Sequence, residues 1–224
     1  PTLAAALADA IEAYPDTAVR DDVIAAMEQV AQLSDAAGTR QMLTVCSTDA
    51  AIVAAFEALE SPEERAMWLY VNSAAKFNEA VIARWFDEGL MRDSSQRWTL
   101  PACPGLHLTD ADQKTIAAHV ASFYQQRFGY GRNYQPYVVP RPLEGSLLFV
   151  IDLSDHACNR AVWVSGTLKR GPLILSRTLV LNYHLATGRT ETVAPGGEVA
   201  QKVLVDAFTE YGLKKKGTAT KIVR

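Results

Sequence analysis

Two cysteine–histidine pairs are the first residues of this 224-residue chain whose types could do chemistry. Cys103 stands four residues before His107, and His156 stands two residues before Cys158. Zinc prefers thiolate and imidazole ligands, so these four side chains would form a tetrahedral site if they converged. Neither pair has a recognised local ligand spacing, and about 50 residues separate the pairs. The spacing therefore predicts no metal ligand and no cofactor. Whether the four residues nevertheless converge depends on the distances between their side chains in the fold.

The polar sequence around His156 has a second chemical interpretation, in which its imidazole activates a cysteine nucleophile. Cys158 would have to lose its proton to a nearby base before it could attack. Asp155 precedes the histidine, but nothing in the sequence marks an oxyanion hole or a group that orients the base. The segment 155–158 is therefore interpreted as a polar loop between two strands, and no catalytic residue is predicted from it.

Carboxylate chemistry is the third interpretation, and it starts from Asp152 at the end of an apolar run. Two metal ions need further acidic ligands, for which Asp155 and Glu191 are the candidates. This set is incomplete, because a short β-meander offers too little chain for such a nuclease fold. A metal-dependent hydrolase that uses Asp152, His156 or His184 remains an alternative, and the distances between Asp152, His184 and Glu191 decide it.

DNA binding through a winged helix is the fourth interpretation. Three helical segments at 49–59, 62–71 and 73–88 precede two segments that could form a wing, Gly89–Arg92 and Arg97–Leu100. This order of elements is typical of helix-turn-helix relatives.

The charges weigh against DNA binding by the third of these helices. It would offer DNA three side chains: Lys76, Asn78 and Arg84. It also carries three acidic residues that repel phosphate: Glu79, Asp87 and Glu88. The whole chain has 22 basic and 25 acidic residues, which gives a net charge of −3 and lacks the basic excess of most nucleic-acid binders. Nucleic acid is therefore an alternative partner that we do not favour.

Interleaved arginine and aromatic residues in the segment 127–134 could stack on RNA bases, but such residues more often fix a crossing between two parts of a chain. Several motifs with a known mechanism are absent from the sequence: a Walker phosphate loop, Gly-x-Gly-x-x-Gly, His-Glu-x-x-His and Gly-x-Ser-x-Gly. Standard nucleotide hydrolysis, dinucleotide redox chemistry and two common hydrolase mechanisms are therefore disfavoured.

Composition indicates a globular protein with reduced thiols. Hydrophobic residues make up 49% of the chain, which is enough for a substantial core. Three widely spaced cysteines make a poor disulfide framework and predict a cytoplasmic protein. The longest apolar run, Leu147–Leu153, is far below the roughly 20 residues of a membrane span, so no membrane partner is expected. The N-terminal residues do not resemble a signal peptide, and a first residue Pro1 leaves open a longer natural chain.

Hydrophobic periodicity divides the chain into a helical part and a β-strand part. Helices are predicted at 2–14, 17–37, 48–59, 62–88 (with a possible break near Asn72 and Ser73) and 109–128. The apolar run 42–46 is either a buried strand or a connector. After 129–142 the period changes from 3.6 to 2, which predicts strands at 147–153, 161–164, 173–183 and 189–193. A last helix at 199–211 would present Val199, Val203, Ala207, Phe208 and Tyr211 to the sheet.

These patterns predict an α+β fold: an N-terminal helical bundle, part of which could form a winged helix, followed by a four-stranded antiparallel β-meander with one C-terminal covering helix. The predicted parts are a helical domain at 1–130, a linker at 131–142, a sheet with its helix at 143–213 and a basic, mobile tail at 214–224. Since Leu147–Leu153 is apolar at nearly every position, both faces of its strand should be covered. We therefore expect the helical part to dock on the sheet and a functional site to lie in the seam between them.

The function that these patterns favour is a non-enzymatic, cytoplasmic interaction, adaptor or sensing module that acts through protein–protein contacts. Its partner would be another protein chain or a second copy of itself, bound through free faces or edges of the sheet. The alternatives are a winged-helix DNA-binding regulator with a C-terminal sensing or dimerisation half, and the metal-dependent hydrolase described above.

Overall fold

The computed structural model describes residues 9–90, 95–164, 167–215 and 219–222. These residues form a mixed α+β structure around one antiparallel sheet, as the sequence predicts. The described strands are ordered β2–β3–β4–β5–β1–β6 across the sheet. Their bounds are β1 Gln96–Thr99, β2 Tyr134–Arg141, β3 Ser146–Val164, β4 Thr167–His184, β5 Arg189–Val193 and β6 Thr220–Lys221.

The predicted count of four strands is wrong, because the sheet described here has six. The strands predicted at 147–153 and 161–164 are one continuous strand, β3. β2 comes from the proline-containing linker and is an edge strand, where residues without an N–H are tolerated. β1 comes from the part predicted to be helical and pairs with β5, and β6 comes from the tail predicted to be mobile and pairs with β1.

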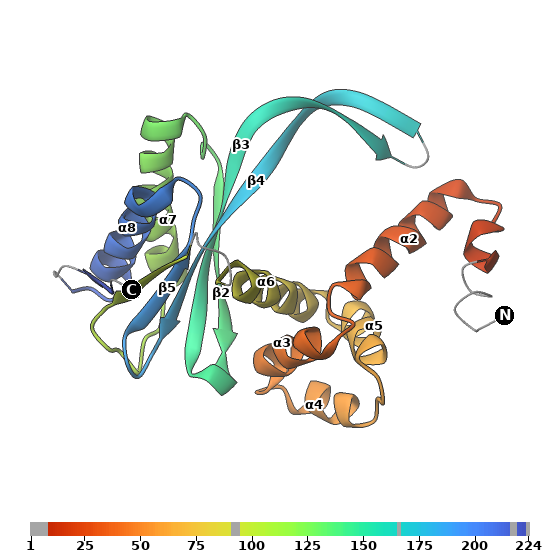
Figure 1. Cartoon of the computed structure of the whole chain (residues 1–224), viewed down its shortest axis with the longest axis horizontal. Helices are drawn as coiled ribbons and strands as arrows, with labels where there is room; N and C mark the ends of the chain where they lie inside the picture. The colour runs from red at the N-terminus through yellow and green to blue at the C-terminus, as the bar shows by residue number, and fades with distance from the viewer. Residues whose placement is uncertain (1–8, 91–94, 165–166, 216–218, 223–224) are drawn as a thin grey trace.

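β3 and β4 form a hairpin that is much longer than the rest of the sheet. β2 pairs with β3 as far as Leu153, and β5 pairs with β4 only from Val180 onward. The register between β3 and β4 shifts between Ser154 and Ala157, and beyond this bulge the hairpin projects from the sheet as a curved two-stranded arm (Figure 1). The segment 155–158 is therefore part of β3, and its interpretation as a loop between two strands is wrong.

The two faces of the sheet are covered by different helices, as Figure 1 shows. α7 (Asp110–Phe128) and α8 (Gly197–Ala207) share one core with alternate residues of β3, such as Phe149 and Ile151. The intervening residues, such as Leu148 and Val150, belong to a second core with the N-terminal helices. This double coverage explains the apolar run in β3 and confirms that the helical part docks on the sheet.

The N-terminal helices are α2 Thr17–Ala31, α3 Ala36–Cys46, α4 Ala50–Glu57, α5 Pro62–Asn72 and α6 Ala74–Leu90. The prediction of one helix from 17 to 37 is wrong, and so is a strand at 42–46, which lies in α3. The side chain of Asp35 caps α3 by accepting from the backbone N–H of Gly38 at 2.7 Å. A Cβ atom on Gly38 would lie 2.3 Å from the carbonyl oxygen of Leu33, so only glycine allows the chain to turn this tightly.

Other helix boundaries agree with the sequence signals. Ser61 and Thr109 each form a capping box at the start of α5 and α7, and Gly129 ends α7 with a φ of +77°. Four of the five residues predicted to face the sheet from the last helix pack in the core, and Val199 does not. Val199 is 65% exposed, and the buried side includes Ala200 and Leu204. α8 continues into a π-helical turn, η2 (Phe208–Gly212), and η1 (Pro142–Glu144) is a 3-10 turn between β2 and β3.

Candidate functional site

A groove lies in the seam between α6 and the sheet, and it is the site that the geometry favours. It consists of two adjoining hollows of about 420 Å³ and about 310 Å³, and both are lined by Trp85, Glu88 and Thr178. The first hollow is also lined by Gln32, Val81, Ile82 and Arg84. The second is also lined by Gly89, Arg177, Val193, Ala194 and Pro195. We call these two hollows together the α6–β4 groove.

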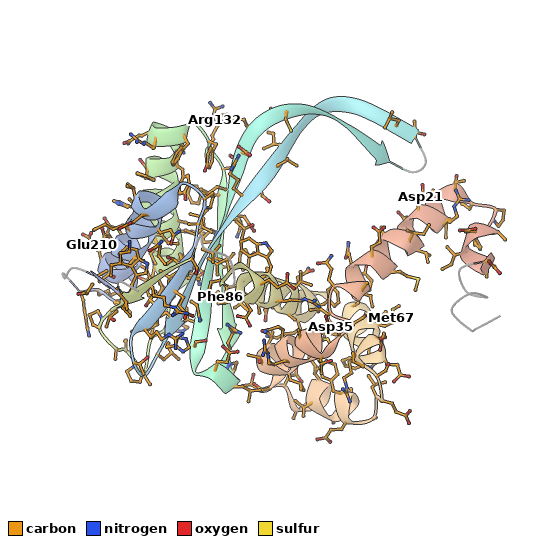
Figure 2. The ribbon with its side chains drawn as sticks, in the orientation of Figure 1. Asp21, Asp35, Met67, Phe86, Arg132 and Glu210 are labelled. Atoms are coloured by element: carbon orange, nitrogen blue, oxygen red, sulfur yellow. The ribbon has the colours of Figure 1, made fainter. Side chains whose placement is uncertain are left out.

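The helical periodicity of α6 explains why Trp85 faces the groove. Four side chains along α6 are buried against the other helices and the sheet: Phe77, Ala80, Ala83 and Phe86. Figure 2 labels Phe86 where α6 meets the sheet. The residue before Phe86 is turned by about 100° from this buried side. Trp85 is therefore 41% exposed and presents an indole beside the seam.

Arg84 fixes the helical wall of the groove. Its Nη1 and Nη2 donate to the two carboxylate oxygens of Asp35 at 2.9 and 2.8 Å, and its Nε donates to Glu88 at 2.8 Å. Nη1 also donates to the carbonyl oxygen of Gln32. The pKa of Asp35 is lowered, first by the N–H of Gly38 and then by Arg84. These bonds join α6 to the turn between α2 and α3, so the wall is already formed in the free chain.

Thr178 connects the strand wall of the groove to Asp152. Its hydroxyl donates to Oδ1 of Asp152 at 2.5 Å, and the hydroxyl of Tyr137 donates to Oδ2 at 3.2 Å. Burial raises the pKa of Tyr137, and the negative charge of Asp152 raises it further. Both oxygens of Asp152 therefore have structural partners within the sheet.

Arg177 lies where the groove meets the base of the arm. Its Nε donates to Asp155 at 2.8 Å, and its guanidinium carbon lies 4.9 Å from the centre of the Tyr130 ring. The ring of His156 meets Tyr130 edge-on at 5.9 Å, and its Nε2 lies 3.1 Å from the carbonyl oxygen of Phe128. Asp155 and His156, which the sequence analysis considered for catalysis, therefore hold the arm against the end of α7.

The two cysteine–histidine pairs do not lie together. Cys158 is paired with Leu173 in the arm, whereas the backbone N–H of Cys103 bonds the carbonyl oxygen of Leu185 just after β4. Twelve residues of extended chain from 173 to 185 span roughly 40 Å. Within the parts of the chain that the structure describes, no group of three or more His, Cys, Asp or Glu residues is arranged to hold a metal ion.

Of the three residues whose distances decide the hydrolase alternative, His184 and Glu191 share a neighbour, and Asp152 lies elsewhere. The Nδ2 of Asn182 lies 3.3 Å from Nε2 of His184 and 3.3 Å from Oε2 of Glu191. Glu191 is buried and also accepts from Arg189. Asp152 is opposite Thr178, six residues before His184 on β4, which corresponds to roughly 20 Å of strand.

Two of the three helix residues named for DNA binding form ion pairs within the chain, and the third, Asn78, is exposed. Lys76 pairs with Glu79 at 2.8 Å, and Arg84 pairs with Asp35 and Glu88. Gly89 is in α6, and the expected wing residues 91 and 92 lie outside the described residues. In the segment 127–134, Tyr130 is buried in the core and Phe128 stacks on it at 5.7 Å, whereas Arg132 is exposed (Figure 2). These two aromatic rings fix the crossing between α7 and β2.

Sequence reasoning did not find Trp85, although a signal was present. The buried positions 77, 80, 83 and 86 follow a helical period, so a tryptophan at 85 stands beside the buried stripe rather than within it.

No helix in the described ranges 9–90, 95–164, 167–215 and 219–222 has both the length and the apolar composition that a membrane crossing needs. Comparison with protein-family models and with curated proteins found no match to this chain.

Proposed function

We propose that this chain is a non-enzymatic interaction module that binds a partner protein through the α6–β4 groove. The observation that carries the proposal is the position of Trp85, which is 41% exposed and lines both hollows of the groove. Tryptophan is enriched among the residues that dominate binding energy in protein interfaces, where it fills well-packed pockets.

The walls of the groove support this proposal. Val81, Ile82 and Val193 give the groove apolar surface, and Arg84, Glu88 and Arg177 add charges of both signs at its edges. The ion pair between Arg84 and Asp35 fixes the helical wall before any partner arrives. A preformed site loses less conformational entropy on binding, so more of the contact energy remains as affinity.

The hydrogen bonds of the candidate catalytic residues also favour binding over catalysis. Asp152 and His156 each have partners that belong to the fold, Thr178 and Tyr137 for the first and the backbone of Phe128 for the second. A general base must instead be within reach of a substrate proton.

A cytoplasmic location is part of the proposal. None of the three cysteines, all in described parts of the chain, takes part in a disulfide. Burial raises the pKa of Cys46 to about 11, which keeps its thiol protonated at neutral pH. Proteins whose thiols stay reduced are typical of the cytosol.

The test is to compare wild type with Trp85→Ala as bait. Each tagged protein is incubated with an extract of the source cells, cross-linked and analysed by quantitative mass spectrometry. We expect a defined set of proteins to be retained by wild type and reduced at least about tenfold by Trp85→Ala, because loss of an interface tryptophan commonly costs 2 kcal/mol or more.

Tyr134→Ala is the matched control, since Tyr134 is 38% exposed and lies on the edge strand β2, outside the groove lining. It should retain the same proteins as wild type. Circular dichroism and urea unfolding must show that both variants are folded. Equal retention by Trp85→Ala and wild type would show that the groove is not the binding site.

A further inference from the structure

Two elements project from the body of the protein on the same side of the sheet, the β3–β4 arm and helix α2 (Figure 1). Gln32, the C-cap of α2, and Arg177, at the base of the arm, both line the α6–β4 groove. The two projections therefore leave the molecule from opposite walls of one groove.

α2 presents an apolar stripe to solvent. Val19, Val23 and Met27 are 42%, 39% and 38% exposed, and they continue a helical row that ends at the buried residue Val30. Val30 is the only buried residue of α2. Stripes of this kind normally pack against another element, and here most of the stripe has solvent where a core would be.

The arm has the same character. Leu168 and Ile174 are 44% and 59% exposed. Beyond the bulge at Ser154–Ala157 the arm is a two-stranded hairpin, and a hairpin without further strands or a covering helix is marginally stable in water. A partner that covers the apolar side chains of the arm would stabilise it.

The charges of the two projections are opposite. The sequence from Asp9 to Ala31 contains one basic residue, Arg20, and six acidic residues: Asp9, Glu12, Asp16, Asp21, Asp22 and Glu28. The sequence from Asp155 to Arg177 contains one acidic residue, Asp155, which is paired with Arg177, and three further basic residues: Arg160, Lys169 and Arg170. Opposite charges around apolar centres favour a specific encounter between two surfaces.

The lengths also agree. The outer part of the arm on β3, from Ala157 to Val164, spans about 26 Å at roughly 3.3 Å per residue. The 15 residues of α2 span about 22 Å at roughly 1.5 Å per residue. One arm can therefore cover one α2 helix along its full length.

We propose that two copies of this chain associate so that the arm of each copy lies along α2 of the other. Each copy carries both a basic arm and an acidic helix, so a two-fold arrangement forms the same contact twice, as isologous dimers do. This inference names a partner for a surface beside the α6–β4 groove, and it is tested separately from the role of Trp85.

The experiment measures the mass of the full chain in solution by sedimentation velocity and light scattering. Wild type should change with concentration from the 24.4 kDa of one chain toward twice that mass. A rise from 0.05 to 1 M salt should increase the dissociation constant, because salt screens exposed charges. The helix variant Asp21→Lys with Asp22→Lys and the arm variant Lys169→Glu with Arg170→Glu should each be monomeric at concentrations where wild type is dimeric.

Mixing the two variants gives the most direct test. In one contact of a mixed dimer, the two lysines of the helix variant meet the two glutamates of the arm variant, so the charges at the substituted positions are again opposite. In the other contact, the unchanged arm meets the unchanged helix. The mixture should therefore form dimers that neither variant forms alone. Trp85→Ala should dimerise like wild type, which separates this inference from the proposed function.

Three outcomes would overturn the proposal. The first is a wild-type chain that stays monomeric up to several hundred micromolar. This outcome overturns the proposal even if the monomer binds duplex DNA through Lys169 and Arg170. The second is a dimer that persists in both charge variants. The third is a mixture that stays monomeric although circular dichroism shows both variants to be folded.

Discussion

Nε of Arg177 donates a 2.8 Å hydrogen bond to Oδ2 of Asp155 at the point where the arm leaves the sheet. The register of β3 and β4 shifts at this point, so regular strand pairing is interrupted. The guanidinium also lies over the ring of Tyr130, which follows α7. One arginine of β4 therefore connects the bulge of β3 to the segment that follows α7.

Arg177→Ala should loosen the base of the arm with little effect on global stability. Because Arg177 is 44% exposed, we expect a loss of about 1 kcal/mol or less in the free energy of unfolding. The hydrogen bond from the N–H of Gly131 to the carbonyl oxygen of Ser154 should open more often. Hydrogen exchange would show this as faster exchange at Gly131.

The control for this variant is Lys202→Ala, which removes an exposed ion pair with Asp206 on α8. It should leave exchange at Gly131 unchanged. If Arg177→Ala also leaves that exchange unchanged, the contacts of Arg177 do not hold the arm.

The lowered pKa values of two carboxylates predict how the free energy of unfolding depends on pH. The folded state lowers the pKa of Asp155 below its ordinary value of 3.8, first through the N–H of His156 and then through Arg177. It lowers the pKa of Asp35 in the same direction, through the N–H of Gly38 and then Arg84. The unfolded chain therefore binds more protons than the folded chain when the pH falls toward 3.8 and below.

The stabilisation by these carboxylates should be complete above pH about 5 and should be lost as the pH falls through their folded pKa values. Urea unfolding at pH 7, 5, 4 and 3 measures this dependence. Asp35→Asn with Asp155→Asn should flatten the curve below pH 5, since asparagine keeps an oxygen acceptor but does not titrate. An unchanged slope in the double variant would assign the acid sensitivity to other groups.

The sequence predicted those features of the fold that depend on neighbouring residues. The predicted start at 62 is confirmed, and the range predicted for α7 agrees with the structure to within one residue. The caps at Ser61, Thr109 and Gly129 that set these boundaries are each made within one turn of helix. The continuity of β3 through its bulge was missed, because Asp155 and His156 are polar like loop residues. β1 has four residues and is held by pairing with β5, whose residues lie 90 to 96 positions later, which no local pattern can show.

The candidate site was harder to predict than the fold for the same reason. The expected seam exists, but its walls depend on contacts such as Arg84 with Asp35, which are 49 residues apart in the sequence. The polar groups that attracted attention, such as Cys103 and Cys158, are separated by the length of β4. Residue type alone therefore suggested chemistry where the fold uses the same side chains for structure or keeps them apart.

Gly188 and Gly145 offer a test of how the two turns flanking the β3–β4 hairpin are built. Both have positive φ, +71° and +59°. A Cβ atom on Gly188 would lie 1.9 Å from the carbonyl oxygen of Leu100, whereas one on Gly145 would meet nothing within 4 Å.

Gly145→Ala should cost about 1 kcal/mol, the strain of a left-handed alanine, and Gly188→Ala should cost at least about 2 kcal/mol more. Urea unfolding of the two variants under the same conditions gives the difference. Equal losses would mean that the turn at Gly188 can move away from Leu100 without cost.

Arg141 and Arg40 both contact the carboxylate of Asp87, the first from a buried position and the second from an exposed one. Arg141 on β2 is 1% exposed, and its Nη2 donates to Asp87 at 3.1 Å, to Glu144 at 2.7 Å and to Gln41 at 3.2 Å. Arg40 on α3 is 67% exposed and lies 3.7 Å from Oδ2 of Asp87. The first arginine joins α3 and α6 to the sheet, and the second adds a solvated charge.

Arg141→Ala should lower the free energy of unfolding by about 3 kcal/mol, because it removes the buried cation from Asp87 and Glu144 and the donor from the buried Oε1 of Gln41. Arg40→Ala should change it by about 0.5 kcal/mol or less, as is usual for exposed pairs. Urea unfolding followed by circular dichroism and by tryptophan fluorescence measures both values. Similar losses for the two variants would show that the buried cation does not hold the helical part on the sheet. A large loss for Arg141→Ala with non-coincident transitions would show that the helical part detaches before the sheet unfolds.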